Sequence, residues 1–155
     1  MPFISGERSP GYAGDVHASI SGLSINTQPI EIARAMLEAV AYRFALIHNL
    51  IAAALPPAPR PAEIVASGNG ILPYPAWLQI FADVLNRSVV ASAEKEATSR
   101  GAALLALRSI GALKALDEVS ADLGEIFEPR ANRHALYLKA IERQNTLYDL
   151  LITNH

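Results

Sequence analysis

The longest pattern of apolar positions predicts a helix over residues 27–54. Apolar side chains recur there every three or four residues, which predicts a wide buried face made by Ile32, Ala35, Met36, Ala39, Val40 and Phe44. Thr27 is expected to cap this helix, with Pro29 in its first turn. Because Arg43 lies within its most apolar part, a buried core helix is favoured over a membrane span.

Shorter apolar runs predict the other elements of an α/β layer structure. Strands are predicted over residues 16–21, 62–66 and 88–92, and helices over 75–85, 98–109 and 133–151. Thr98 or Ser99 is expected to cap the middle helix of these three. Residues 1–15 and 110–132 are expected to form loops and short turns. The run PPAPRP at 56–61 favours a stiff spacer, with an SH3-type ligand as the alternative.

Composition narrows the classes of function. The 155 residues suffice for one domain, 1–155, with its own core, and their net charge is −2 without a basic block. Nucleic acid and an anionic membrane are therefore poor candidates for partners. The absence of cysteine excludes a disulfide scaffold and a thiol nucleophile, and the four histidines lack metal-ligand spacing, so no metal site is predicted. The N-terminus lacks a signal-peptide pattern, and a cytoplasmic location is expected.

The segment SGNG at 67–70 joins a predicted strand to a predicted helix. A glycine turn in this position can hold a phosphate on free backbone N–H groups. It can equally be a tight connection in which only Gly68, Gly70 or a tolerant Asn69 fits a positive φ. The turn matches neither a Walker A nor a Rossmann fingerprint, so both interpretations stay open.

A second run of small residues, Gly101, Ala102 and Ala103, lies in the first turns of the helix at 98–109. Small side chains there would allow either tight packing of the helix on the sheet or the close approach of a ligand. No nucleophile elbow is present, and carboxylates show no paired spacing. Asp83 is the carboxylate of most interest, because it lies on the helix that follows the glycine turn. A surface or capping role is nevertheless favoured over catalysis for it.

Four segments in order resemble the C-terminal domain of the FGGY carbohydrate kinases, and the first also resembles a loop of the gluconate kinase-like branch. They are PFISGERSPGY at 2–12, SISGLSINTQPIEIARAMLE at 19–38, SGNGILPYPAWLQIFADVL at 67–85 and EATSRGAALLAL at 96–107. The resemblance covers nearly the whole chain. It implies a partial ribonuclease H-like, actin-like ATPase domain, with a short mixed sheet packed by helices.

The resemblance also implies a site for the adenosine of ATP or ADP. Its residues would be Gly68, Asn69, Gly70, Tyr74, Trp77, Gln79, Gly101 and Ala102. Adenine would lie over the start of the helix at 75–85, with the second glycine segment on its other side. Asn69 replaces the family's usual glycine, and Tyr74 replaces its usual small serine. The asparagine side chain could crowd a phosphate, and the tyrosine could stack on adenine or fill part of its pocket.

In the family, the sugar site, the catalytic aspartate and the phosphate loops lie outside the segments matched here. The chain is therefore expected to be the adenosine-carrying part of a kinase for a sugar or sugar acid such as gluconate, and to be inactive alone, without catalytic residues. Mg²⁺ and sugar would act only in the complete enzyme. The alternatives are a stand-alone, non-catalytic module that binds nucleotide or protein, and a remnant without ligand.

Association is expected as well, either as a homodimer or with the N-terminal half of a kinase. The strand at 16–21 is expected to lie directly on residues 62–67 in a rearranged sheet, or to pair across a dimer.

Overall fold

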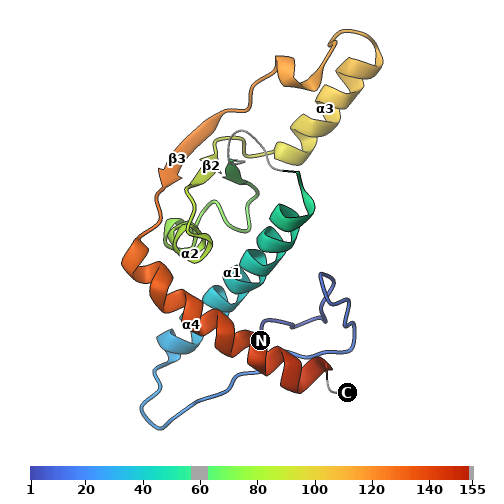
Figure 1. Ribbon diagram of the computed structural model, residues 1–155. Coiled ribbons are helices and arrows are strands. Elements are labelled where there is room, and N and C mark those ends of the chain that lie inside the picture. The colour runs from blue at the N-terminus through green and yellow to red at the C-terminus, as the bar shows by residue number, and fades with distance from the viewer. Residues whose placement is uncertain (57–62, 154–155) are drawn as a thin grey trace.

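The computed structural model describes residues 1–56 and 63–153 (Figure 1). In chain order its elements are α1 (Pro29–Ala54), β1 (Ile64–Ala66), α2 (Pro75–Leu85), β2 (Val89–Ser92), α3 (Ala97–Ser109), the short 3-10 helix η1 (Leu116–Glu118), β3 (Leu123–Phe127), α4 (Ala131–Tyr148) and the π-helical turn η2 (Asp149–Thr153). The prediction of α/β structure is confirmed. The predicted spacer at 56–61 lies outside the described residues except for Pro56.

A three-stranded mixed sheet has the order β1-β2-β3. β1 and β2 are parallel, with Ile64 opposite Val89, and α2 forms the crossover between them. β3 is antiparallel to β2, with Val89 opposite Phe127 and an irregularity between Val90 and Ser92. The parallel pair requires a helical crossover, which explains why the sequence alternates strand, helix and strand here.

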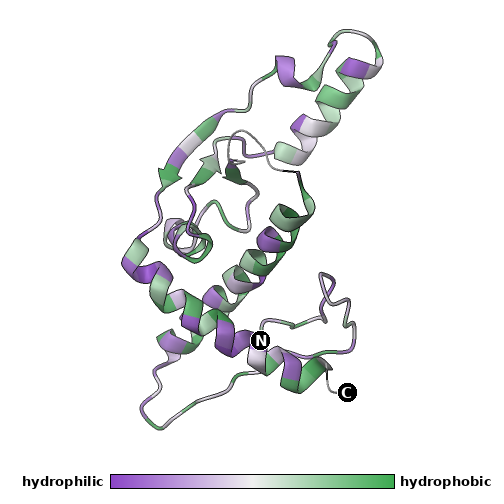
Figure 2. Ribbon diagram, in the orientation of Figure 1, coloured by the Kyte–Doolittle hydropathy of each residue, from purple (hydrophilic) through white to green (hydrophobic). Residues whose placement is uncertain are grey.

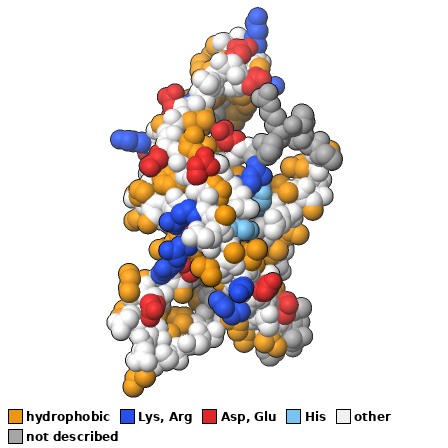
Figure 3. Space-filling view, turned by 60° about the vertical axis from the view of Figure 1, so that its left-hand side comes forward, with side chains coloured by type: hydrophobic (Ala, Val, Ile, Leu, Met, Phe, Trp, Pro, Cys, Tyr) orange, Lys and Arg blue, Asp and Glu red, His pale blue; other side chains and the backbone are white. Residues whose placement is uncertain are grey.

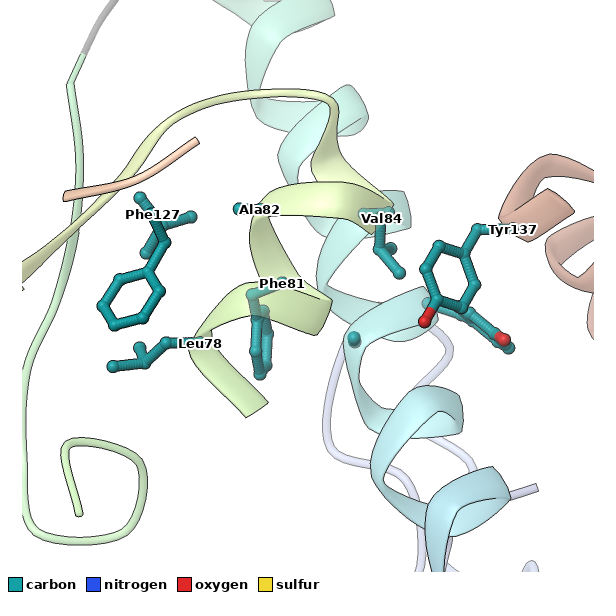
Figure 4. Packing of buried hydrophobic residues seen from close by; sticks show 10 residues of the cluster. Leu78, Phe81, Ala82, Val84, Phe127 and Tyr137 are labelled. Atoms are coloured by element: carbon teal, nitrogen blue, oxygen red, sulfur yellow. The ribbon is translucent and has the colours of Figure 1, made fainter. Parts of the chain in front are cut away.

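The core lies where α2 is enclosed by α1, α4 and the sheet (Figure 4). Leu78, Phe81, Ala82 and Val84 of α2 are all buried there. Phe127 of β3 and Tyr137 of α4 approach from either side, as do Ala41, Tyr42 and Ala45 of α1 and Val89 of β2. The helical spacing of the α2 residues predicted this helix with its observed bounds, because the same apolar positions drive its packing.

The buried face of α1 differs from the predicted one. The residues that it buries are Ala39, Ala41, Tyr42, Arg43 and Ala45, whereas Met36 and Phe44 of the predicted face are exposed. Apolar residues occur around most of α1, so their period alone could not define which side packs on α2 and α4. Large apolar side chains are exposed on other elements too. Figure 2 shows hydrophobic and hydrophilic residues interspersed along the ribbon, and Figure 3 shows hydrophobic side chains among charged ones on the face that it draws.

α1 is long and apolar enough to cross a membrane by length and composition, with a mean hydropathy of 1.2 over 18 residues. Its contacts with α2 and α4 and the buried ion pair of Arg43 with Glu7 place its middle part in the core of the domain, and 22% of the apolar window is buried. The core helix of a folded domain can have the same length and hydropathy, so one such helix is weak evidence for a membrane span.

The N-terminal loop is held against α1 and α4 by buried polar contacts. The guanidinium of Arg43 pairs with the carboxylate of Glu7, which also accepts a hydrogen bond from the Tyr148 hydroxyl at 2.5 Å. Arg43 further stacks over the rings of Phe3 and Tyr148, at 5.3 and 4.7 Å from their centroids. The hydrogen bond from Glu7 N–H to Ala13 O, 2.8 Å long, closes the loop on itself.

The prediction of a strand over residues 16–21 is wrong, because this segment is irregular and lies outside the sheet. Within residues 1–56 and 63–153, the one residue with which its backbone exchanges hydrogen bonds is Met1, through Ser19. Without a longer neighbouring strand, the ladder stops after this single pair. The predicted direct pairing with residues 62–67 is therefore not formed, and pairing across a dimer remains a prediction.

Several boundaries also differ from the sequence predictions. α1 is capped by Gln28, whose N–H donates to the carboxylate of Glu31 at 2.8 Å, while the Thr27 hydroxyl accepts a hydrogen bond from Ser24 N–H instead. α3 follows Glu96, so neither Thr98 nor Ser99 is its cap. α4 begins at Ala131 rather than at residue 133, and after Tyr148 the π-helical turn η2 continues the helical run past the predicted end at 151. β1 begins at Ile64; residue 62 of the predicted strand is outside the described part.

β3 was missed, because residues 110–132 were expected to be loops and turns. Four of its five residues are exposed, and only Phe127 is buried. A strand that lies at the edge of a sheet and buries one side chain has too little apolar alternation to be recognised from its sequence.

Candidate functional site

The glycine turn and the start of α3 lie at the same edge of the sheet. β1 ends at Ala66 immediately before the turn, and β2 ends at Ser92 shortly before α3. Because β1 and β2 are parallel and Ala66 lies opposite Ala91, both segments leave the sheet at its carboxyl edge. In open α/β sheets this edge is where ligands bind. The two runs of small residues, separated by about thirty positions in the sequence, are thus brought to one end of adjacent strands.

Within the turn, Gly68 has φ of +94°. This left-handed conformation requires glycine, and its carbonyl accepts hydrogen bonds from the N–H groups of Ile71 and Leu72, both 3.2 Å long. The interpretation as a tight connection is therefore correct for Gly68. Neither Asn69 nor Gly70 is among the described residues with positive φ, so backbone conformation does not demand a glycine at 70.

The space beside these glycines is open. A Cβ built on Gly68, Gly70 or Gly101 would meet no atom within 4 Å, apart from chain neighbours. The absence of side chains at Gly70 and Gly101 is thus explained neither by positive φ nor by packing, which leaves room for a group to approach the backbone. These residues fit a ligand that lies against bare main chain.

α2 begins directly after the turn. Tyr74 precedes its first residue and is 58% exposed, so its ring is free of the core. Trp77, one turn later, donates its indole N–H to the carbonyl of Leu37 in α1 at 3.0 Å. Gln79 donates its amide to Asp83 at 3.1 Å and to the carbonyl of Glu128 at 2.8 Å. Trp77 and Gln79 therefore have contacts that tie α2 to its neighbours.

α3 holds Gly101 and Ala102 in its second turn and buries none of its residues. Figure 1 shows the helix projecting from the sheet, and its main contacts are with η1. Tight helix–sheet packing is therefore not the reason for the small residues. Arg100 fixes the beginning of α3, because it pairs with Glu94 at 3.0 Å and donates to the carbonyl of Ser120 at 2.8 Å.

Asp83, on α2, has a structural role. Its carboxylate is fully buried and accepts a hydrogen bond from the backbone N–H of Arg130, the residue that caps α4, at 2.8 Å. The side chain of Arg130 approaches the same carboxylate to 2.5 Å. Burial alone would raise the pKa of Asp83, but the hydrogen bonds from Arg130 and Gln79 outweigh it and lower this pKa. The predicted surface position is wrong because Asp83 is fully buried, and its contacts with Arg130 join the end of α2 to the start of α4.

A second polar cluster, around Glu38, was not singled out by sequence reasoning. This carboxylate accepts hydrogen bonds from Arg34 at 2.6 Å, from the Tyr42 hydroxyl at 3.2 Å and from the Tyr137 hydroxyl at 3.1 Å. Burial and the neighbouring Glu38 carboxylate raise the pKa of Tyr42. The cluster joins α1 to α4. The spacing of Arg34, Glu38 and Tyr42 at four-residue steps was its one signal in the sequence.

Comparison with known proteins gives the family. Residues 1–110 match the FGGY family of carbohydrate kinases, C-terminal domain. Among curated relatives, glycerol kinase 1 of Thermotoga maritima is 33% identical over 132 residues, which are 84% of this chain and 26% of that protein. Gluconokinase of Bacillus subtilis is 26% identical over 151 residues, which are 97% of this chain and 28% of that protein.

Solved structures show the same fold. A xylulose kinase from Brucella ovis superposes with a TM-score of 0.82 at 25% identity, covering 100% of this chain and 32% of that one. Gluconate kinase from Lactobacillus acidophilus gives 0.79 at 25% identity, over 97% and 30% of the two chains. Plasmodium falciparum glycerol kinase, solved with ADP, gives 0.72 at 25% identity with the same coverage.

The chain spans between 26% and 32% of the lengths of these relatives. The partial actin-like ATPase fold that the sequence resemblance implied is confirmed by these superpositions. Because the family match covers residues 1–110 of 155, the chain belongs to the FGGY family of carbohydrate kinases and is similar to its C-terminal domain.

Proposed function

We propose that this chain is the adenosine-carrying part of an ATP-dependent carbohydrate kinase. The observation that carries the proposal is the glycine turn at the carboxyl edge of two parallel strands, within the residues that match the family. Gly68, Asn69 and Gly70 would lie against ribose and the α-phosphate, with Tyr74 beside adenine. The Plasmodium glycerol kinase was solved with ADP, which supports a nucleotide as the ligand class.

The remaining proposed residues have different supporting roles. Gly101 and Ala102 would form the opposite wall, where the open space beside Gly101 gives adenine room. Trp77 and Gln79 would act on the site mainly through the position of α2, since their polar groups already bind Leu37, Asp83 and Glu128. Kinase reactions depend on positioning the γ-phosphate and Mg²⁺. No group of three or more His, Asp or Glu side chains gathers in the described residues, so this part of the chain offers no metal cage.

The complete enzyme would phosphorylate a sugar or sugar acid, and gluconate is the proposed example. The resemblance of residues 2–12 to the gluconate kinase-like branch and the gluconokinase relative support it. A xylulose kinase and a glycerol kinase match at 29% and 33% identity, so these substrates are the alternatives. Sugar contacts are proposed to belong to the rest of such an enzyme, and a cytoplasmic location is proposed with it. The second candidate is a stand-alone module that binds nucleotide without catalysis. The open glycine turn is the observation that supports it.

Nucleotide binding to two matched glycine variants tests the adenosine site. Gly68→Val places a side chain in the turn, and Gly111→Val makes the same change at another glycine with positive φ and open surroundings, after α3. Both changes strain a left-handed backbone, so they should lower stability by similar amounts. Isothermal titration calorimetry with ADP should detect binding to the original chain and to Gly111→Val and none to Gly68→Val.

Equal loss of binding in both variants, or full binding in both, would contradict the placement of the site. A second pair on α3 avoids the effect of positive φ. Gly101→Val should abolish ADP binding, whereas Ala106→Val, an equally β-branched change on an exposed face of the same helix, should leave it unchanged.

A further inference from the structure

The glycine turn contains an Asn-Gly step that occurs once in the sequence. Asn69 is followed by Gly70, whereas the other asparagines are followed by Thr27, Leu50, Arg87, Arg133, Thr146 and His155. Asparagine is a thermolabile residue, because the next backbone nitrogen can attack its side-chain amide. A glycine in the next position puts no side chain in the way of this attack. The turn therefore contains the pair of residue types best suited to such a reaction.

The backbone N–H of Gly70 is free in the fold. The turn is closed by the carbonyl of Gly68, which accepts hydrogen bonds from the N–H groups of Ile71 and Leu72 and bypasses the N–H of Gly70. No hydrogen bond from Gly70 N–H is found among the residues that the structure describes. Its nitrogen is therefore not held by an acceptor, as a nucleophile requires.

The other asparagines within the described ranges differ in this respect. The N–H groups that follow three of them donate hydrogen bonds: Thr27 to Ser24 at 3.0 Å, Arg87 to Ala82 at 3.3 Å and Arg133 to Arg130 at 2.9 Å. The N–H groups of Leu50 and Thr146, which follow two more, lie inside α1 and α4 and belong to helical hydrogen bonds. The fold thus protects these positions and leaves Asn69 unprotected.

The side chain of Asn69 is also unrestrained. It is exposed, and its amide has no hydrogen-bond partner within residues 1–56 and 63–153. Gly70 is exposed as well, and a Cβ built on it would meet no atom within 4 Å apart from chain neighbours. The two hydrogen bonds that close the turn lie in a surface loop, where local opening requires little free energy. Neither packing nor hydrogen bonding therefore keeps the amide of Asn69 away from the nitrogen of Gly70.

We propose that Asn69 is a site of deamidation, at which the side-chain amide is replaced by a carboxylate. A base in the solvent takes the proton of Gly70 N–H, and the nitrogen lone pair forms a bond to Cγ of Asn69. The Cγ–Nδ2 bond breaks, and Nδ2 leaves as ammonia with the proton that the base had taken. The product is a five-membered succinimide ring.

Water then opens this ring at one of its two C–N bonds. Breakage of the new bond gives aspartate, whereas breakage of the original peptide bond gives isoaspartate, whose main chain runs through Cγ. In sum, one amide and one water become one carboxylic acid and one ammonia. The reaction therefore needs no oxidant, reductant or other co-reactant.

Both products place a negative charge in the glycine turn. Their effect on ligand binding rests on the proposed function, in which Asn69 lies beside ribose and the α-phosphate. A carboxylate there would repel the phosphate, and isoaspartate would also lengthen the main chain of the turn. Deamidation would thus weaken nucleotide binding as the chain ages. The modification itself depends only on the geometry of the turn.

Peptide mass spectrometry of the folded chain tests the modification. After incubation at about pH 8.5, residue 69 should be a mixture of aspartate and isoaspartate, while the other asparagines of the described ranges keep their amides. At about pH 7.5 the conversion should be about tenfold slower, because the ionised fraction of the Gly70 nitrogen falls tenfold per pH unit. Gly70→Ala and Asn69→Gln should keep the amide at position 69, since a Cβ hinders the attack and glutamine would need a larger ring.

Circular dichroism reports whether each variant is folded, and the open space beside Gly70 accommodates the added Cβ. Retention of the Asn69 amide in the folded chain overturns the inference, and so does its loss only in urea, because the turn would then protect it. Conversion of Gly70→Ala as fast as the original chain also overturns it.

Calorimetry with ADP separates the modification from the nucleotide site. Asn69→Asp should bind ADP about tenfold more weakly than Asn69→Gln, because only the first adds a charge. Equal affinities would overturn the predicted effect of deamidation on binding. Absence of ADP binding to the freshly prepared original chain would instead contradict the proposed function, while the mass spectrum would still decide whether Asn69 is modified.

Discussion

The buried carboxylate of Asp83 is joined to Arg130 through both the backbone and the side chain of that residue. Its Oδ1 accepts the N–H of Arg130 at 2.8 Å, and its Oδ2 lies 2.5 Å from Nη2. Asp83 is in the last turn of α2 and Arg130 immediately precedes α4, so the contact fixes the beginning of α4 on the end of α2. Gln79 completes the arrangement by donating to Oδ1 at 3.1 Å.

Replacing this carboxylate should destabilise the fold. Asp83→Ala leaves the N–H of Arg130 and one contact of Gln79 without an acceptor, at a cost of about 1–3 kcal/mol in the free energy of unfolding. Urea denaturation followed by circular dichroism measures the change. Asp122→Ala, which removes an exposed carboxylate, should change the stability by less than about 0.5 kcal/mol. Equal changes in the free energy of unfolding for the two substitutions would show that the buried contact does not stabilise the fold.

The Asp83 carboxylate should also make the folding stability depend on pH in the acid range. The pKa of Asp83 is lower in the folded chain than in the unfolded chain, where it is about 3.9. The carboxylate therefore contributes fully to folding stability above that pH, and this contribution is lost as the pH falls through the folded pKa. Asp83→Asn should therefore flatten the fall in melting temperature as the pH drops below about 4. Asp122→Asn should keep the slope of the original chain, and an unchanged slope in Asp83→Asn would contradict the assignment.

The hydroxyl of Tyr148 should stabilise the N-terminal loop. It donates to the buried Glu7 carboxylate, a contact that raises the pKa of Tyr148. Tyr148→Phe keeps the ring over Arg43 but removes this hydrogen bond to a charged group, and should lower the free energy of unfolding by about 1–2 kcal/mol. Tyr12→Phe, at a ring that is 79% exposed, is the control and should be neutral. Thermal denaturation of both variants decides whether the hydroxyl matters.

The elements that the sequence predicted well are those whose own packing produces the pattern. α2 buries Leu78, Phe81 and Val84 at helical spacing, and its start and end agree with the prediction. The segment at 16–21 also has good strand composition, but a strand needs a neighbour. Among the described residues, its backbone forms hydrogen bonds with Met1 alone. β3 was missed for the opposite reason: it has a neighbour in β2 but buries only Phe127.

The candidate site was predictable as a set of segments but not as a geometry. Gly68 and Gly101 were singled out from their surroundings in the sequence, and the parallel pairing of β1 with β2 explains why they come to one edge. The long-range polar contacts were not predictable, because Glu7 and Arg43, or Asp83 and Arg130, show no fixed spacing. A charged residue inside an apolar helix, such as Arg43, was the available sign that a buried partner must exist.

The exposed apolar side chains of α1 should promote association of the chain. Phe44, Leu50 and Ile51 are each about half exposed. β1, moreover, has a sheet neighbour on one side only among the described strands. We expect a dimer in light scattering at high concentration. Ile51→Lys should shift the chain towards monomer, whereas Ile110→Lys, at the more exposed residue after α3, should not.

A monomer at all accessible concentrations would contradict self-association. It would leave the N-terminal half of a kinase as the proposed partner of this surface.

Catalysis is not expected from the 155-residue chain by itself. The family's phosphate loops and catalytic aspartate are not recognised in its sequence, and positioning of the γ-phosphate accounts for most of the rate in such reactions. A coupled assay with ATP and gluconate should therefore show no sugar-dependent release of ADP above background. Turnover at ordinary kinase rates, about 1–100 per second, would refute this expectation.

The affinity ratio between ATP and AMP tests the central claim, that this chain carries the adenosine end of a nucleotide site. Contacts through Gly68, Gly70 and Gly101 would be made with adenosine and the α-phosphate, which both nucleotides share. Calorimetry on the original chain should give weak dissociation constants for AMP, ADP and ATP that agree within about threefold, a difference below about 0.7 kcal/mol. ATP bound more than about tenfold tighter than AMP, or no binding of any of the three, would contradict the account.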